Sequence, residues 1–210
     1  MKWINFLIDS NIQYYIYKLD LEDAIILNKN NSNKNKLFTV LNGSILVTKI
    51  FYNNEIIPIA ILNNNNIFTI KNLSDRYYYQ IKALEKTYII TFTLQKIFTK
   101  KNRTNLLVHI IENYQKTIHH YEVMNEIINQ KYAKLRILQL IFILCLEFGR
   151  IEQKKIFLPM KLSYHNLAII SGTNKTTVSK IIREMHKNKV IKYSNKYKIY
   201  INNIFNIKFR

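Results

Sequence analysis

A stripe of cationic and hydroxyl side chains recurs on one face of a predicted helix in the C-terminal part of the chain. The side chains of this stripe belong to Lys175, Thr176, Ser179, Lys180 and Arg183. Ammonium and guanidinium groups bind phosphate oxygens, and with hydroxyl groups they can donate hydrogen bonds to base edges. The pattern therefore favours recognition of nucleic acid over catalysis.

The stripe lies on the second of two helices predicted within residues 163–186. Val178 and Ile182 give that helix an apolar side at helical spacing. Gly172 supplies a turn that admits a positive φ, and Asn174 can cap the second helix. Two helices joined by such a turn are typical of the helix-turn-helix motif, whose second helix enters the major groove of DNA. An ordinary helical hairpin with a solvated basic face is the alternative.

The sequence around the two helices strengthens the nucleic-acid interpretation. Two short alternating runs follow around Ser194-Asn195 and predict a β-hairpin wing. Residues 151–210 hold 13 lysine or arginine residues against 2 acidic ones, a difference of +11 within a total net charge of +19. Such a local concentration is the electrostatic footprint of nucleic-acid binding.

Other chemistries find little support in the sequence. Residues 1–100 contain no histidine, which argues against a metal-dependent barrel enzyme of the cupin kind. No nucleophile elbow, phosphate-binding loop or paired-cysteine zinc signature is present. The adjacent His119 and His120 should diverge on a helix surface, and Cys145 reads as a buried small hydrophobe. The chain is thus predicted to be neither an enzyme nor a metal protein.

The part of the chain before residue 100 is expected to fold as a small antiparallel β barrel or jelly roll. After a helical or irregular lead-in to about residue 24, short apolar runs alternate with polar turns. The Asn42-Gly43 pair between two such runs predicts a β-hairpin. The predicted strands are Ile25–Leu27, Leu37–Leu41, Ser44–Phe51, Ile56–Leu62, Tyr77–Leu84 and Thr87–Phe92.

Two helices are predicted between the barrel and the basic module. The first covers residues 104–129, with apolar residues about every 3.5 positions, the spacing of a coiled-coil seam. We expect it to pair with a second copy, because helix-turn-helix proteins usually read two half-sites, and also to pack on its own barrel. The second covers residues 132–148 and ends at Gly149, with a strand at 155–158. The predicted seam residues are Leu107, Ile111, Tyr114, Ile118, Tyr121, Met124 and Ile128.

The expected domains are a β-barrel effector-type domain at residues 1–100, a dimerisation helix at 101–130 and a winged helix-turn-helix domain at 131–210. The longest apolar run, residues 137–146, is too short to span a bilayer, and no secretory signal is visible, so no membrane partner is expected. Heavy use of Ile, Asn, Lys and Tyr is typical of a gene from an AT-rich genome.

This order of parts resembles the Crp/Fnr family of bacterial transcription regulators, and within it the global nitrogen regulator of cyanobacteria, the NtcA type. The likeness covers nearly the whole chain, and with the codon bias it suggests the version encoded in red algal plastids. It implies a fold that is α+β, with a cyclic-nucleotide-binding-like jelly-roll barrel. The segments that carry it are LNGSILV (41–47), SDRYY (74–78), FILCLEFG (142–149), LPMKLSYHNLA (158–168) and SGTNKTTVSKII (171–182).

The resemblance implies base-reading roles for Lys175, Thr176 and Lys180. The first and last of these positions are typically Arg in the family, and Lys lacks the bidentate fork that reads guanine. Hydroxyl and amide groups near the turn lie where they can meet phosphate oxygens, although capping accounts for them equally. The full predicted DNA-contacting set is Ser163, Thr173, Asn174, Lys175, Thr176, Thr177, Ser179, Lys180 and Arg183.

The resemblance also implies an effector site for 2-oxoglutarate between the barrel and the long helix. Arg76 and Glu122 match two residues of that site, whereas its helix arginine falls on Thr117, with Lys116 beside it. Either Lys116 supplies the missing charge or effector sensing is altered or lost. The cyclic-nucleotide phosphate cassette of the wider family is missing from the sequence, which argues against cAMP.

The function expected from these observations is that of a homodimeric, sequence-specific regulator of nitrogen-responsive genes. Its partners would be double-stranded promoter DNA and RNA polymerase, in a plastid stroma or a bacterial cytoplasm. The alternative is a basic architectural or RNA-associated protein without a regulatory role.

Overall fold

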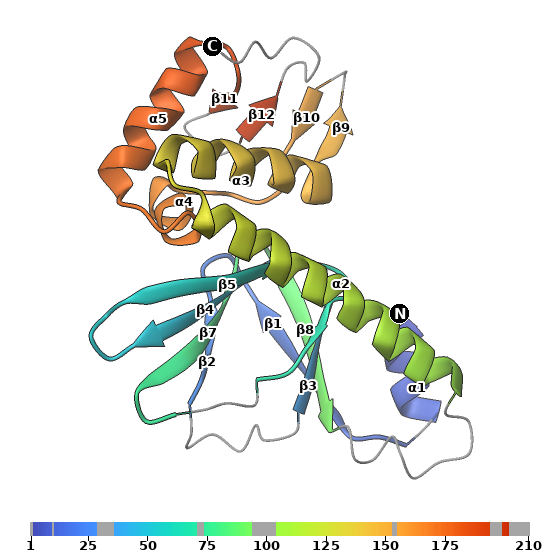
Figure 1. Ribbon diagram of the computed structural model, residues 1–210. Coiled ribbons are helices and arrows are strands. Elements are labelled where there is room, and N and C mark those ends of the chain that lie inside the picture. Colours follow the sequence, from blue (N-terminus) through green and yellow to red (C-terminus); the bar gives the residue numbers. More distant parts are fainter. Residues whose placement is uncertain are drawn as a thin grey trace. The chain divides into compact units, whose positions relative to one another are not determined.

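The computed structural model describes residues 2–9, 11–28, 36–70, 74–93, 104–152, 155–193 and 199–201. The chain divides into two compact units, residues 1–124 and residues 125–210, with the boundary inside the longest helix. The first unit is a β domain and the second combines three helices with a small sheet (Figure 1).

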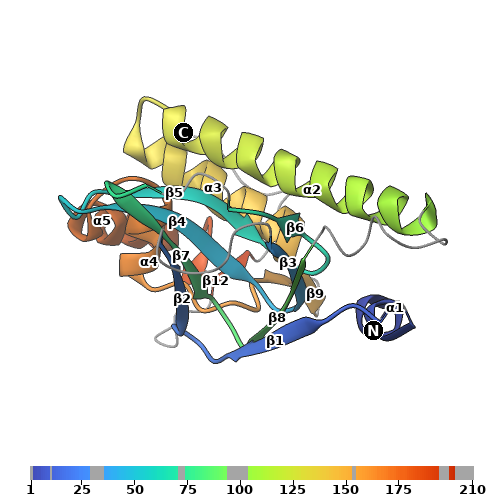
Figure 2. The same cartoon turned by 90° about the horizontal axis from the view of Figure 1, so that it is seen from below.

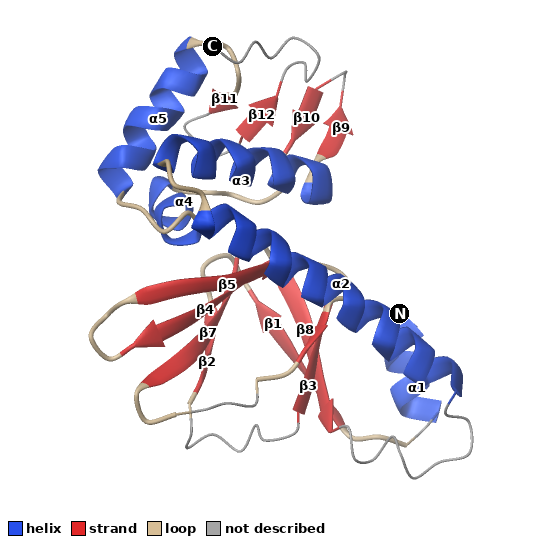
Figure 3. Cartoon of the chain, viewed as in Figure 1, coloured by secondary structure: helices blue, strands red, loops and turns tan. Residues whose placement is uncertain are grey.

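Two four-stranded antiparallel sheets build the first unit (Figure 3). Sheet A has the strand order β1-β8-β3-β6, and sheet B has the order β2-β7-β4-β5. The strands are β1 (Tyr14–Leu19), β2 (Ala24–Leu27), β3 (Lys36–Asn42), β4 (Ile45–Phe51), β5 (Ile56–Leu62), β6 (Ile67–Phe68), β7 (Tyr77–Ala83) and β8 (Thr87–Thr93). The short helix α1 (Lys2–Asp9) precedes them.

The core of this unit lies between the two sheets, because every second residue of each strand points inward. Phe38 and Ile89 come from sheet A, whereas Val47, Ile81 and Leu62 come from sheet B, and all five belong to one buried cluster. A second cluster, which includes Trp3 and Leu7, packs α1 against the outer face of sheet A. The α+β class and the antiparallel β domain expected from the sequence are confirmed.

The six predicted strands are present, and two further strands were missed. β1 lies in the predicted lead-in, and its sequence YYIYKL lacks the expected alternation of apolar and polar residues; three of its six residues are exposed. It nevertheless pairs along its whole length with β8. β6 pairs with β3 and has only two residues, so its sequence is too short to show a periodicity.

The hairpin predicted at Asn42-Gly43 is wrong. β3 belongs to sheet A and β4 to sheet B, so this turn carries the chain from one sheet to the other. Gly43 has φ +91°, and a Cβ there would lie 2.4 Å from Thr87 Oγ1. The Asn-Gly pair therefore marks a tight turn and a close approach of backbones, but not a hairpin.

The long helix α2 (Thr104–Asn129) has the predicted bounds, and its predicted seam with a second copy stays a prediction, because the structure contains one chain. Ile111 and Ile118 are 57% and 51% exposed, whereas Met124 is buried. The buried side carries several polar residues, which a search for apolar residues overlooks. Its members, three or four positions apart, are Ile110, Asn113, Thr117, His120, Met124 and Ile127.

A hydrogen bond ties α2 to sheet A: the Ile67 backbone N–H donates to Thr117 Oγ1 at 3.1 Å. The Thr117 hydroxyl in turn donates to the Asn113 carbonyl. One turn further on, His120 is buried, while its neighbour His119 is exposed. The prediction that both histidines lie on the helix surface is therefore wrong for His120.

The second unit contains the helices α3 (Ala133–Phe148), α4 (Tyr164–Ile170) and α5 (Lys175–Lys187). Its sheet C is antiparallel, with the order β11-β12-β10-β9 (Figure 2 labels β9 and β12 among these elements). The strands are β9 (Arg150–Glu152), β10 (Lys155–Phe157), β11 (Lys192–Tyr193) and β12 (Ile199–Ile201). Among the described residues, no helix is both long and apolar enough to cross a bilayer.

Gly149 ends α3, as predicted, but not in the left-handed conformation of a C′ glycine. Its φ is −65° and its ψ 143°, which is extended backbone. A Cβ at this position would lie 2.1 Å from the Cys145 carbonyl oxygen and 2.6 Å from Ile156 Cγ2. Position 149 therefore requires glycine because there is no space for a Cβ, and not because of a positive φ.

Candidate nucleic-acid interface

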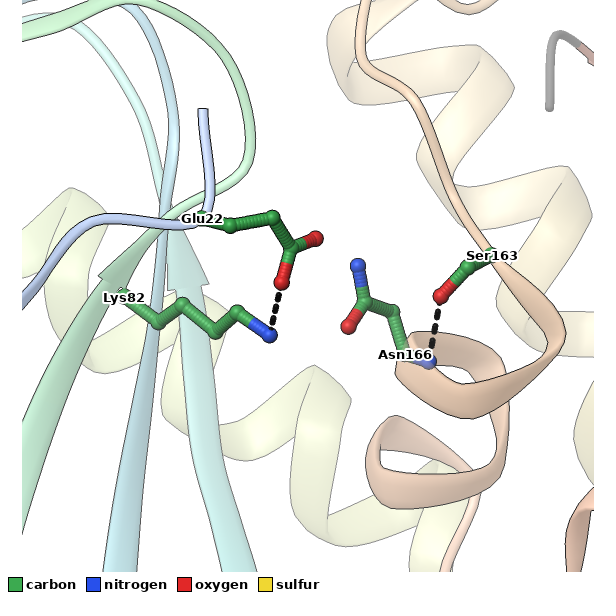
Figure 4. A network of polar contacts seen from close by, with 4 residues as sticks. All are labelled: Glu22, Lys82, Ser163 and Asn166. Carbon is green, nitrogen blue, oxygen red and sulfur yellow. Dashed lines mark hydrogen bonds and ion pairs between the residues drawn. The ribbon is translucent and has the colours of Figure 1, made fainter. Parts of the chain in front are cut away.

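Both helices of the motif begin at side-chain caps. The Asn166 N–H donates to Ser163 Oγ at 3.1 Å, which starts α4 (Figure 4). The Thr177 N–H donates to Asn174 Oδ1 at 2.7 Å, which starts α5. Each cap satisfies one of the backbone donors that a helix start leaves unpaired. The predicted cap at Asn174 is confirmed, and the capping role weighed for Ser163 is observed. Figure 4 also shows, within the first unit, the Glu22–Lys82 ion pair.

The turn between the helices depends on Gly172, which has φ +57°. Its neighbours close the turn, since the Thr173 N–H donates to the Ala168 carbonyl at 3.0 Å and the Gly172 N–H to the Ile169 carbonyl. A Cβ added to Gly172 would meet no atom within 4 Å, so conformation and not space selects glycine here.

Replacing Gly172 with Ala should lower the free energy of unfolding by about 1 kcal/mol, because an L side chain disfavours the left-handed region. Gly172→Asn is the matched control, since Asn tolerates this region better and should cost less. Urea unfolding of both variants measures the difference. Equal losses for Ala and Asn would contradict the conformational explanation.

Helix α5 is divided into a buried and an exposed face. Its buried residues are Val178, Ile181, Ile182 and Met185, which pack it onto its own unit. The predicted base-reading side chains of Lys175, Thr176 and Lys180 are all exposed, as is Arg183. Asn174 is also exposed, while Ser163, Thr173, Thr177 and Ser179 are half-buried. The structure thus brings the predicted DNA-contacting residues together on α5 and the segments leading into α4 and α5.

The predicted wing consists of β11 and β12, whose residues Lys192 and Tyr193 pair with Tyr200 and Ile199. The turn predicted at Ser194-Asn195 lies outside the described residues. Tyr193 anchors this wing to the start of α4, because its hydroxyl donates to the Leu162 carbonyl at 2.8 Å and its ring stacks on Tyr164 at 5.0 Å. The sequence offered no signal for this anchor beyond two aromatic residues 29 positions apart.

Replacing Tyr193 with Phe should remove the hydrogen bond to Leu162 and keep the ring stack. We expect a loss of about 1 kcal/mol in the free energy of unfolding and weaker duplex binding by a few-fold, since the wing is held less firmly. Tyr200→Phe is the control, because among the described residues the Tyr200 hydroxyl has no hydrogen-bond partner. An equal loss in the control would argue against the anchor.

An ion pair joins helix α5 to helix α3. Lys134 Nζ on α3 lies 2.6 Å from Glu184 Oε1, and both side chains are about half exposed. Glu184 is the only acidic residue of α5, so this pair neutralises a charge that would otherwise oppose a polyanion. Sequence reasoning missed Lys134, although a lone acid in a basic helix is a usable signal.

In the part of the chain that the structure describes, no hydrogen bond or ion pair joins the candidate effector residues to one another. Arg76, Lys116 and Glu122 are exposed, and Thr117 is buried with its hydroxyl used by two backbone groups. Among the described residues, no hydrogen bond or ion pair joins Arg76 to a side chain of α2, and its backbone N–H donates to Ser74 Oγ within its own turn.

The single cysteine, Cys145, is buried as predicted. Burial raises the pKa of Cys145 to about 12, so its thiol stays protonated.

The same geometry is found in solved structures of low sequence identity. TTHB099, a transcriptional regulator of the CRP family from Thermus thermophilus, has a TM-score of 0.72 at 12% identity, over 90% of this chain and 93% of that one. TTHA1359, a CRP/FNR-family transcriptional regulator from the same organism, has a TM-score of 0.65 at 15% identity, over 89% and 93%. A cyclic nucleotide-binding domain containing protein from Listeria monocytogenes EGD-e has a TM-score of 0.72 at 16% identity, over 94% and 95%.

These likenesses establish the fold: a β domain like those that bind cyclic nucleotides, a long helix, and a C-terminal region like the winged helix-turn-helix of CRP. Two of the three proteins are described as transcriptional regulators, and none of the three is described as an enzyme. No protein-family model and no curated protein matches the sequence. Among the described residues, no three His, Cys, Asp or Glu side chains gather where a metal ion could bind.

Proposed function

We propose that this chain is a sequence-specific regulator of transcription that binds double-stranded DNA as a homodimer. The observation that carries the proposal is helix α5, which is capped at Asn174, buried along one side, and exposes Lys175, Lys180 and Arg183 along the other. A major groove is wide enough to admit one α-helix, so the exposed side can face base edges while the buried side stays on its own unit.

Charge supports the same proposal. The region from residue 151 onward carries an excess of 11 positive charges, which favours binding to phosphates by release of counterions. Thr173 and Thr177, half-buried at the start of α5, can donate to phosphate oxygens and so fix the register of the helix. Residues 131–210 would form the DNA-binding domain and residues 1–100 the effector-type domain.

Helix α2 supplies a surface for the second copy. Val108, Ile111 and Ile118 are exposed by 47%, 57% and 51%, and they recur at spacings of three and seven residues on the side away from the buried residues. An exposed apolar stripe of this spacing is what a two-stranded coiled coil buries. In the dimer, residues 101–130 would then hold the two copies of α5 about 34 Å apart, a distance that equals one helical turn of DNA.

The finer assignment rests on the resemblance to the nitrogen regulators. It makes nitrogen-responsive genes the targets, RNA polymerase the partner at the promoter, and a plastid stroma or a bacterial cytoplasm the compartment. On this assignment the effector is 2-oxoglutarate, and its binding site would include Arg76, Lys116, Thr117 and Glu122.

The proposal is tested by titrating the protein against a pool of duplex DNA, single-stranded DNA and duplex RNA at several salt concentrations. A regulator should retain two chains per duplex and prefer particular DNA sequences at about 0.15 M salt. Equal affinity for the three nucleic acids, with no preferred sequence, would instead favour the basic architectural or RNA-associated protein.

A further inference from the structure

The first strand of the β domain leaves one of its sides open. β1 is an edge strand of sheet A and pairs in continuous register with β8 on one side only (Figure 2). Among the described residues, the other side of β1 makes no backbone hydrogen bond. Tyr15 and Ile16 lie within this strand and are exposed by 65% and 45%. The open side therefore presents backbone donors and acceptors together with apolar side chains.

Sheets A and B have four edge strands among the described residues, and three of them carry a feature that discourages pairing with another chain. β6 has two residues and β2 has four, so both offer a short edge. β5 contains Pro58, which has no N–H, and the register of its pairing with β4 is broken by a shift. β1 has six residues, no proline and an unbroken register, and Lys18 is its only charged residue. β1 is thus the edge that is least protected against a further strand.

We propose that β1 pairs antiparallel with β1 of a second copy, about a two-fold axis that passes beside Ile16. A two-fold axis presents the same strand twice, so a single edge supplies both partners. The outer faces of the two joined sheets then lie on the same side, and outward residues oppose outward residues. Tyr14, Ile16 and Lys18 point outward, because Tyr17 and Leu19 alternate with them and belong to the core between the sheets.

The single lysine of β1 selects the register. When Ile16 lies opposite Ile16 of the second copy, Lys18 lies opposite Tyr14 of that copy. An ammonium group beside an aromatic ring is favourable, and Lys36 Nζ already lies 5.8 Å from the ring centroid of Tyr15 on this strand. A register centred on Lys18 would instead place two like charges directly opposite each other, which is destabilising. Charge and apolar contact therefore favour the register centred on Ile16.

The pairing is expected to be weak in the free protein. Two paired six-residue strands bury well below the roughly 1,200 Å² of a stable interface, so we expect a Kd of about 0.1 mM or higher. The consequence rests on the proposed function. If α2 forms the DNA-binding dimer, then β1 joins two such dimers into a group of four chains. Two dimers bound to one DNA molecule would meet at a high local concentration, which favours this contact.

Cysteine cross-linking tests the contact and its register. Cβ atoms of directly opposite residues in a strand pair lie about 4.5–5.5 Å apart, so a disulfide can trap the pair. Ile16→Cys, oxidised with diamide at a protein concentration near the expected Kd, should therefore give covalent dimers on a non-reducing gel. Lys18→Cys should not, because its two copies are offset by four residues, or about 13 Å. The parent chain controls for Cys145, which is buried.

Sedimentation equilibrium measures the association without a cross-link. At the same concentration the parent should form particles of more than two chains. Ile16→Lys should weaken this association about tenfold, because two ammonium groups then oppose each other. Ile26→Lys is the matched control, since it makes the same change at a residue of β2 that is 50% exposed, and it should associate as the parent does. Thermal unfolding shows that the variants fold.

No cross-link by Ile16→Cys, equal cross-linking by Lys18→Cys, or unchanged association of Ile16→Lys would overturn the inference. The first of these results is also expected if β1 binds an extended segment of another protein. Duplex DNA binding is measured on the same samples. A parent that binds DNA as two chains, without an Ile16→Cys cross-link, removes only the β1 pair. A cross-link in a protein that does not bind duplex DNA keeps the β1 pair and contradicts the proposed function.

Discussion

Replacing Lys175 and Lys180 together with Ala should weaken binding to the preferred DNA sequence by about 100-fold or more at about 0.15 M salt. Both side chains are exposed on the same side of α5, so their loss should not disturb its packing. A contact to a base edge or phosphate is worth about 1–3 kcal/mol, and a dimer loses four such contacts. Fluorescence anisotropy with a labelled duplex measures the change.

Lys187→Ala with Lys189→Ala is the matched control. It removes the same charge from each chain, but at the far end of α5 and in the turn beyond it. This control should reduce the salt dependence without abolishing the preference for sequence, because general attraction to phosphates scales with charge and not with position. Equal losses in the two double variants would mean that α5 does not read bases.

Replacing Ile111 and Ile118 together with Asp should convert the dimer to a monomer. The two side chains are more than half exposed in a single chain, and a carboxylate buried in a dimer seam has no partner there. Sedimentation velocity should show the mass of one chain, 25.2 kDa, at concentrations where the parent sediments as two. DNA affinity should fall by about 100-fold or more, because two half-sites are then read independently.

Ile8→Asp with Ile16→Asp controls for surface charge, since these isoleucines are exposed by 57% and 45% and belong to α1 and β1 instead of α2. This variant should remain dimeric. A parent chain that is already monomeric at micromolar concentration, or a control that dissociates equally, would argue against α2 as the dimer surface.

The sequence predicts much of the fold because the relevant signals are local. The caps at Ser163 and Asn174, the turn at Gly172 and the apolar runs of strands such as β5 each depend on residues a few positions apart. The start and end of α2 follow from periodicity alone. The contacts of the β domain with α2 do not, since they join residues 50 positions apart, as in the Ile67–Thr117 hydrogen bond.

The errors have a common physical cause. Apolar spacing alone does not predict the side of α2 that packs on its own β domain, because this side includes Asn113, Thr117 and His120, which hydrogen bonds or other polar contacts accommodate. The Asn-Gly turn has the chemistry of a hairpin, and only the pairing of β3 with β8 and of β4 with β7 shows that it links two sheets. The residues next to a position in the sequence do not determine which distant residue it contacts across the core.

The central claim, that two copies of α5 read one DNA site, is tested most directly by selecting preferred sequences from random duplex DNA with the purified full-length protein. We expect an enriched inverted repeat whose half-site centres lie about one helical turn apart, near 34 Å, and this enrichment should disappear when Lys175→Ala and Lys180→Ala are introduced. Enrichment of no sequence, or of a single half-site without symmetry, would contradict it.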